Sequence, residues 1–301
     1  MAPPRAEGAP FGRLLTAMVT PMTRDGDVDY DGVQHLATHL VDRGNDGLVI
    51  SGTTGESPTT TDDEKERLLR AVVEAVGDRA HVVAGVGTND TAHTIELARQ
   101  AEKTGASGLL VVTPYYSKPP QAGLLEHFGR VADATGLPTM LYDIPGRSGV
   151  PITTESMLRL AEHDRIVAVK DAKGDLYETT RVLAQTDLAY YSGEDAINLP
   201  MLAIGAVGAV SVVAHACAAE YAAMIRAVQA GDLAEARRIN AAVLPAVRGI
   251  MLQAGGAIMA KAAAEVLGLI GSRTTRPPLA DATEEQVRLL RADLLEAGLP
   301  L

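Results

Sequence analysis

Residues 81–113 read HVVAGVGTNDTAHTIELARQAEKTGASGLLVVT, and this stretch contains one complete strand–helix–strand unit. Two apolar runs rich in β-branched residues, at 81–86 and 108–112, border a segment whose apolar residues have helical spacing. Asp90 stands where a helix N-cap is expected, and Gly105 stands where a left-handed C-cap favours glycine. Because neither run alternates polar with apolar residues, we expect both faces of these strands to be buried, as in a parallel sheet.

The same unit repeats in both directions along the chain. Thr61 and Glu64 form a capping-box pattern, and Gly44, Gly77 and Gly136 each follow a helical stretch at a C-cap position. Strand-like runs begin near Leu14, Gly47, His81, Gly108, Pro138, Ile166, Leu188 and Gly208. Each interval has room for a helix and two short loops. This regularity predicts an α/β fold, a (β/α)₈ TIM barrel; a doubly wound open sheet would give the same local pattern.

The two ends of the chain depart from the repeat. Residues 1–11 contain no apolar run, which predicts a disordered tail and not a signal peptide. We assign residues 12–230 to the barrel. Beyond them no strand-like run remains, and helical patterns separated by glycine and proline predict a C-terminal helical region at residues 231–301.

Composition limits the classes of partner. The net charge of −11, with no run of Lys or Arg, argues against nucleic-acid binding. The single cysteine, Cys217, cannot form an intrachain disulfide, which favours a cytoplasmic location. Residues 199–219 are almost free of charge but rich in Ala, so they predict a buried helix and strand and not a membrane span.

Lys170 is the most informative polar residue. It ends the apolar run at 166–169, where burial would lower the pKa of its ammonium group toward neutrality. Active sites of such barrels lie at the C-terminal ends of the strands, so a neutral amine there could attack a ketone and form an iminium. A structural ion pair with Asp171 or Glu194 is supported equally well by position alone.

Other strand ends carry groups that iminium chemistry on a keto acid would need. Thr53 and Thr54, in a glycine-flanked turn, offer hydroxyl and N–H groups to a carboxylate, unless this is an ordinary turn. Tyr142 is a candidate general acid/base or a packing residue of the rim. Arg147 could bind a second carboxylate or be solvated, and Tyr116 follows another strand.

Metal and nucleotide sites are not indicated. His35 and His39 have helical i,i+4 spacing but no evident third ligand. No phosphate-binding loop and no GxGxxG after the first strand occurs. We therefore expect neither a metal nor a cofactor.

Six segments together resemble the dihydrodipicolinate synthase (4-hydroxy-tetrahydrodipicolinate synthase) family, especially its actinobacterial type, from about residue 12 to the C-terminal helices. The segments are LLTAMVTP (14–21), SGTTGESPT (51–59), VVTPYYSKPPQ (111–121), LYDIPGRSG (141–149), VKDAKGDL (169–176) and YYSGEDAINLP (190–200).

The resemblance implies condensation of pyruvate with L-aspartate 4-semialdehyde in the biosynthesis of diaminopimelate and lysine, without a cofactor, by a homotetramer built as a dimer of dimers. It implies that Lys170 forms the Schiff base with pyruvate. It assigns proton relay to Tyr142, Thr53 and Tyr116, the last reaching into a neighbouring subunit's site. It assigns substrate binding to Thr54, Arg147, Gly193 and Val210.

Two other activities share this pattern. N-acetylneuraminate lyases and keto-deoxy sugar-acid aldolases keep the lysine and the tyrosine, and Arg147 favours the semialdehyde over their substrates. A barrel that binds a keto acid without turnover is a third interpretation, which the co-occurrence of Lys170, Tyr142, Thr53 and Tyr116 disfavours.

One departure from the family concerns feedback by lysine. Asn89 and Tyr115 match a lysine pocket found in inhibited members, but Asp62, Lys65 and His93 stand where two His and one Glu are usual. Losing an acidic partner and adding a cation should weaken binding of a cationic effector. We expect weak or absent inhibition by L-lysine.

Overall fold

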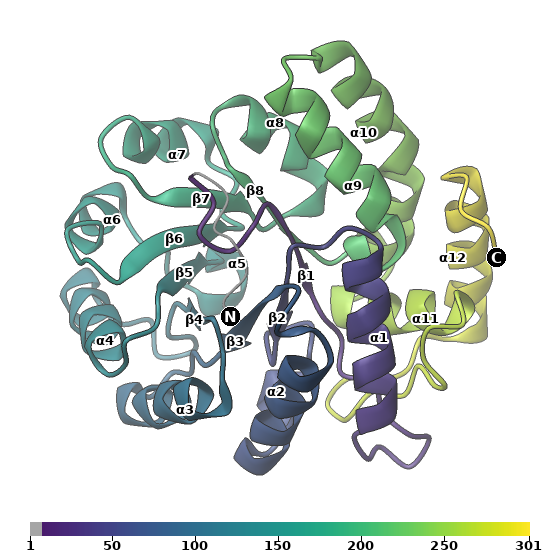
Figure 1. Ribbon diagram of the computed structural model, residues 1–301, viewed down its shortest axis with the longest axis horizontal. Helices are drawn as coiled ribbons and strands as arrows, with labels where there is room; N and C mark the ends of the chain where they lie inside the picture. The colour runs from purple at the N-terminus through teal and green to yellow at the C-terminus, as the bar shows by residue number, and fades with distance from the viewer. Residues whose placement is uncertain (1–7) are drawn as a thin grey trace.

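The computed structural model describes residues 8–301, in which eight parallel strands form a closed barrel (Figure 1). The strands are β1 (Leu14–Ala17), β2 (Gly47–Ile50), β3 (His81–Gly85), β4 (Gly108–Val112), β5 (Thr139–Asp143), β6 (Ile166–Asp171), β7 (Ala189–Ser192) and β8 (Gly208–Ser211). Each strand pairs with the next in the chain, and β8 pairs with β1. The predicted barrel is confirmed, and the open sheet is excluded.

The strand positions agree with the sequence-based ones to within one residue. β5 begins at Thr139 and not at Pro138, and β7 begins at Ala189 and not at Leu188. Proline has no N–H to donate to a ladder, which explains the first difference. The β5–β6 register shifts between Thr139 and Met140, and beyond this irregularity Tyr142 lies opposite Lys170.

Helices surround the strands. Those that follow β1 to β8 are α1 (Tyr30–Asp42), α2 (Asp62–Val76), α3 (Thr91–Thr104), α4 (Gln121–Asp133), α5 (Pro145–Ser148), α6 (Thr154–Leu160), α7 (Leu176–Leu183), α8 (Asn198–Ala203) and α9 (Ala214–Gln229). The predicted capping box of Thr61 and Glu64 begins α2, and the Asp90 carboxylate caps α3 through the Ala92 N–H.

The glycines past the helices do not all do what the pattern predicts. Gly44 and Gly105 have left-handed φ values of 101° and 98°, as expected. Gly77 is right-handed, with φ −65°, and its N–H donates to the carbonyl of Val73. Gly136 has no positive φ either, and its N–H donates to the Glu102 carboxylate. For Gly77 and Gly136 the predicted left-handed cap is therefore wrong.

The N-terminal end of the barrel is closed by the first described residues. Residues 1–7 of the expected tail lie outside the described part of the chain, but Ala9 and Phe11 are buried. The hydroxyl of Tyr191 accepts the Phe11 N–H at 3.2 Å and donates to the Gly12 carbonyl at 2.8 Å. The expectation of disorder is thus wrong for residues 8–11, because the aromatic ring of Phe11 fills the bottom of the barrel.

The C-terminal region consists of α10 (Leu233–Val247), a π-helical turn η3 (Arg248–Leu252), α11 (Gly256–Val266) and α12 (Glu284–Glu296). Together with α9 these helices lie on one side of the barrel, coloured green to yellow in Figure 1. The apolar residues 199–219 form α8, β8 and the start of α9, as a buried helix and strand should. Among residues 8–301 no helix has the length and hydropathy needed to cross a membrane.

Candidate active site

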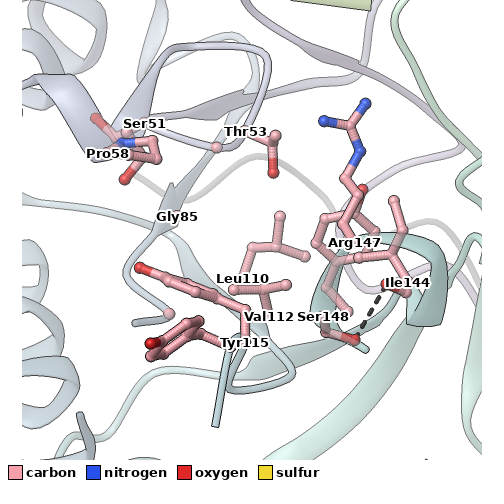
Figure 2. A pocket seen from close by; sticks show the side chains of 15 residues that line it. Ser51, Thr53, Pro58, Gly85, Leu110, Val112, Tyr115, Ile144, Arg147 and Ser148 are labelled. Atoms are coloured by element: carbon pink, nitrogen blue, oxygen red, sulfur yellow. Dashed lines mark hydrogen bonds between the residues drawn. The ribbon is translucent and has the colours of Figure 1, made fainter. Parts of the chain in front are cut away.

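A cavity of about 500 Å³ opens where β2, β3, β4 and β5 end (Figure 2). Thr53 and the guanidinium group of Arg147 lie on the same side of it, across from Tyr115. Its walls are Ser51, Gly52, Thr53, Ser57, Pro58, Gly85, Gly87, Leu110, Val112, Tyr115, Tyr116, Tyr142, Ile144, Arg147 and Ser148. Apolar walls with a few polar groups are typical of a small-molecule site.

Lys170 lies beside the cavity, next to Tyr142 on the neighbouring strand. Its ammonium nitrogen is 4.2 Å from the centroid of the Tyr142 ring. Burial lowers the pKa of Lys170 to about 8; the charges of Asp195 and Glu194 oppose this shift, and that of Arg147 adds to it. A substantial fraction of the amine is therefore neutral near pH 8, which is the form able to attack a carbonyl.

In the described part of the chain Lys170 does not form the alternative ion pair with Asp171 or Glu194. Within residues 8–301, Lys170 takes part in no ion pair. The Asp171 carboxylate is bound by the Thr179 hydroxyl at 2.5 Å and by the Lys173 and Gly174 N–H groups. Its hydrogen bonds thus go to the loop after β6.

Tyr142 is buried at the C-terminal end of β5. Desolvation raises the pKa of its phenol to about 12, with Arg147 opposing and Glu194 adding to the shift. The phenol is therefore protonated at neutral pH and can donate a proton or a hydrogen bond.

Gly193 provides the space for the lysine side chain. A Cβ built on Gly193 would lie 2.8 Å from the Lys170 Cγ and 3.1 Å from its Cε. The Gly193 N–H donates to the Asp171 carbonyl at 2.8 Å, which fixes the backbone in this position. Any larger residue here would push the lysine away.

The Thr53–Thr54 turn connects β2 to α2. Ser51 and Glu56 at its two ends both have a left-handed φ of 57°. The Glu56 N–H donates to the Thr53 carbonyl at 3.1 Å, and the Thr20 hydroxyl donates to the Gly55 carbonyl at 2.7 Å. Thr54 is buried, whereas Thr53 is half-buried and faces the cavity.

Arg147 lies on the short helix α5, and its side chain is exposed. Ser148 ties this turn together, since its hydroxyl lies 3.1 Å from the Ile144 carbonyl and 2.9 Å from that of Val150. The dashed line in Figure 2 marks the Ser148–Ile144 bond. The Asp143 carboxylate, at the start of the turn, accepts the Ile152 N–H at 3.2 Å.

Tyr116 differs from the other candidates, because the residue is 89% exposed. Its φ is +75°, a left-handed conformation that is strained for a residue with a Cβ. It forms part of the cavity rim.

The predicted residues are thus brought together to different degrees. Thr53, Tyr116, Tyr142 and Arg147 line the cavity, whereas Lys170 lies against the Tyr142 ring and Gly193 lies against Lys170. Val210 is buried on β8, opposite Leu15 of β1, and Thr54 is buried in its turn. Neither of these two lines the cavity.

Four charged residues near the site were not singled out from the sequence. The Lys173 ammonium lies 3.8 Å from the buried Asp143 carboxylate, and Lys261 pairs with Glu56. A signal existed for Lys261, since it interrupts the apolar run AIMAKAAAEV just as Lys170 interrupts its strand. In the described part of the chain no cluster of His, Cys, Asp and Glu could hold a metal ion.

Comparison with known proteins identifies the family of the chain. Residues 10–297 match the model of the dihydrodipicolinate synthetase family. The chain is 67% identical, over 290 residues, to the 4-hydroxy-tetrahydrodipicolinate synthase of Kineococcus radiotolerans, covering 96% of this chain and 94% of that one. It is 59% identical to 4-hydroxy-tetrahydrodipicolinate synthase 2 of Streptomyces coelicolor, with 100% of both chains covered.

Among solved structures, dihydrodipicolinate synthase from Cyanidioschyzon merolae with lysine bound superposes with a TM-score of 0.93 at 42% identity, covering 97% of this chain and 99% of that one. The family model and the relatives each cover nearly the whole sequence. The chain belongs to the dihydrodipicolinate synthetase family.

Proposed function

We propose that this chain is a Schiff-base-forming lyase that condenses pyruvate with L-aspartate 4-semialdehyde to 4-hydroxy-tetrahydrodipicolinate, in lysine and diaminopimelate biosynthesis. The observation that carries the proposal is Lys170: a buried amine that forms no ion pair within residues 8–301, with its pKa lowered to about 8, beside the protonated phenol of Tyr142. Membership of the family and the names of the relatives support the choice of substrates.

The chemistry follows from these two side chains. The neutral amine of Lys170 attacks the carbonyl carbon of pyruvate, and loss of water gives an iminium. The iminium accepts the electron pair released when the Tyr142 phenolate, which has given its proton to the leaving water, takes a proton from the pyruvate methyl group. The resulting enamine carbon attacks the aldehyde, whose oxygen takes the proton back from Tyr142. The amino group of the semialdehyde then displaces the Lys170 amine from the iminium carbon, which closes the ring and releases the product. The lysine itself is the electron sink, so no cofactor is required.

The turns at the rim hold the substrates in this proposal. Thr54 binds the pyruvate carboxylate, and Thr53 passes protons between Tyr142 and a second tyrosine. Arg147 binds the carboxylate of the semialdehyde with its exposed guanidinium, which favours this substrate over sugar acids. Gly193 leaves room for the Lys170 side chain, and Val210 contributes to the substrate site from its position on β8, outside the cavity wall described above.

Tyr116 has its proposed place in a neighbouring subunit. Its side chain is exposed and its backbone is strained, two features that make sense if the phenol completes the proton relay of a partner's site. We therefore propose a dimer in which each subunit's Tyr116 completes its partner's site. The family resemblance supports a homotetramer built as a dimer of such dimers, and the single buried thiol of Cys217 favours a location in the cytoplasm.

The experiment that tests the mechanism is reduction with borohydride in the presence of pyruvate, followed by mass spectrometry of tryptic peptides. A pyruvyl adduct on Lys170, absent in Lys170→Met, is the expected result. A folded protein that forms no adduct would overturn the Schiff-base mechanism and favour a keto-acid-binding barrel. Turnover of a sugar acid and not of the semialdehyde would move the assignment to a sibling aldolase.

Feedback by lysine is proposed to be weak or absent. The Asp62 carboxylate lies 3.7 Å from the Lys65 ammonium and 2.9 Å from the His93 ring nitrogen, so this acidic group already has cationic and polar neighbours. A second ammonium would be repelled by Lys65. Steady-state rates measured with increasing L-lysine test this, and an inhibition constant below the millimolar range would refute it.

A further inference from the structure

A buried ion pair connects the C-terminal helices to the active-site turn. The side chains of Lys261, on α11, and of Glu56, at the end of the Thr53–Thr54 turn, are both 0% exposed and in direct contact. The Lys261 ammonium also donates to the Thr274 carbonyl at 2.6 Å. The second oxygen of the Glu56 carboxylate accepts the backbone N–H of Arg276 at 2.8 Å.

Stability alone does not explain this pair. Removing two charges from water has a large free-energy cost, and well-packed apolar residues of similar volume are often as stabilising as a buried ion pair. Burial accordingly lowers the pKa of Lys261, with Glu56 opposing the shift. What the pair does supply is a fixed direction for the Glu56 side chain, because both carboxylate oxygens have partners.

The backbone conformation of Glu56 determines the conformation of the Thr53–Thr54 turn. Its left-handed φ of 57° is a conformation that a residue with a Cβ rarely adopts unless its surroundings impose it. From this residue the N–H closes the turn on Thr53, and the carbonyl accepts the Thr59 N–H at 3.0 Å. The side chain of Glu56 is thus attached to the C-terminal region while its backbone defines where Thr53 and Thr54 lie.

Arg276 forms a second attachment to the same loop. Its guanidinium donates to the Thr59 carbonyl at 2.8 Å and binds both oxygens of Glu64, at 2.6 and 2.8 Å. It also donates to the Gly26 carbonyl at 2.8 Å. The segment around Arg276 therefore lies along the second half of the loop between β2 and α2, from Glu56 to the start of the helix.

We propose that Glu56 and Lys261 are positioning residues for the binding of pyruvate, acting through the Thr53–Thr54 turn. In this way the C-terminal helical region, which we place at residues 231–301, contributes to the active site without contacting the substrate. The inference rests on the proposed roles of Thr53 and Thr54.

The test uses the double variant Glu56→Gln/Lys261→Met, which replaces the ion pair by neutral side chains of similar length and leaves no unpaired charge. We expect the KM for pyruvate to rise about ten- to a hundredfold, as misplacement of a binding group does. The KM for the semialdehyde should stay within about twofold, because Arg147 belongs to another turn.

The matched control is Glu265→Gln/Arg273→Met. This ion pair, with an N···O distance of 2.6 Å, lies in the same C-terminal region but does not touch the turn. Both KM values should equal those of the wild type. If the double variant does not fold, Glu56→Asp decides: it keeps both charges but shortens the side chain that connects the turn to Lys261 by one methylene group, and we expect a rise of about two- to fivefold in the KM for pyruvate.

A reference variant separates this inference from the proposed function. Thr54→Val should itself raise the KM for pyruvate; if it does not, the proposed role of the turn is wrong. If Thr54→Val raises that KM but the folded double variant, or Glu56→Asp in its place, binds pyruvate as the wild type does, the positioning role is overturned.

Discussion

Two turns at the mouth of the barrel are each anchored by a buried carboxylate with a lysine, but in different ways. At the end of β2, Glu56 is in direct contact with Lys261, and both side chains are fully buried. At the end of β5, the Asp143 carboxylate is 2% exposed, but the Lys173 ammonium is 3.8 Å away and 20% exposed. One turn is attached to a distant helix, and the other to the loop after the adjacent strand β6.

The difference affects how firmly each turn is held. Lys173 does not compensate for the burial of Asp143, so the pKa of that carboxyl is raised to about 6. The carboxylate still accepts the Ile152 N–H and thereby closes the turn that carries Arg147. In the proposed function, the first turn holds the substrate that becomes covalently bound, and the second holds the substrate that arrives later. The direct Glu56–Lys261 contact holds the first turn rigidly, which suits a covalently bound substrate. The longer Asp143–Lys173 separation lets the second turn adapt to the substrate that arrives later.

The largest expected effect is on the free energy of unfolding, when the lysine of each anchor is removed in turn. Lys261→Met leaves a fully buried carboxylate without its cation, and the free energy of unfolding should fall by about 3–5 kcal/mol. Lys173→Met should lower it by only about 1–2 kcal/mol, because Asp143 can be protonated instead. Urea unfolding at pH 7 measures both, and equal losses would contradict the comparison.

The next prediction concerns how the free energy of unfolding depends on pH. The pKa of Asp143 is about 6 in the folded protein against an ordinary 3.8, so the folded state binds this proton more tightly. The stability that the wild type derives from this proton is present at low pH and is lost as pH rises through about 6. Relative to Asp143→Asn, the wild type should lose about 2–3 kcal/mol across this window.

Unfolding free energies of the wild type and of Asp143→Asn, measured at intervals from pH 4 to pH 7, check this expectation. Lys173 and Asp171 lie nearby and are present in both proteins, so the difference isolates Asp143. Parallel curves would mean that the pKa of Asp143 is not raised.

A third prediction separates the two turns by substrate. Arg147→Ala should raise the KM for the semialdehyde about ten- to a hundredfold, the loss expected for charged hydrogen bonds worth about 1.5–3 kcal/mol. It should leave the KM for pyruvate unchanged, and Thr54→Val should have the opposite pattern. Initial rates with either substrate varied provide both constants. An unchanged KM for the semialdehyde in Arg147→Ala would refute the assignment of that substrate.

The smallest effect compares the glycines of the two turns. A Cβ on Gly55 would lie 3.1 Å from the Met18 carbonyl oxygen and 3.3 Å from the Thr20 hydroxyl, whereas one on Gly146 has no neighbour within 4 Å. Gly55→Ala should destabilise the protein by about 1–2 kcal/mol. Gly146→Ala should be neutral or stabilise it by up to about 1 kcal/mol, through the unfolded state. Thermal unfolding of both variants measures the contrast, and similar shifts would argue against a tighter first turn.

The sequence by itself determined the barrel and the residues from which its chemistry is built. Apolar runs such as those at 81–86 and 108–112 define strands locally, because a buried parallel strand needs side chains that suit burial on both faces. Lys170 could be recognised for the same reason, as a charge at the end of an apolar run. Lys170 lies close to Tyr142 because β5 and β6, which are consecutive in the chain, are also neighbours in the barrel.

Only the tertiary structure decided which charges pair and which segments close the barrel. Lys261 interrupts an apolar helical run as clearly as Lys170 ends an apolar strand run. Nothing in its spacing, however, indicates Glu56 as its partner. Phe11 belongs to a stretch that is expected to be disordered, yet it fills the base of the barrel. The physical reason is the same in both cases: local patterns report the conformation of a short segment, whereas a contact between distant segments depends on how the completed barrel brings them together.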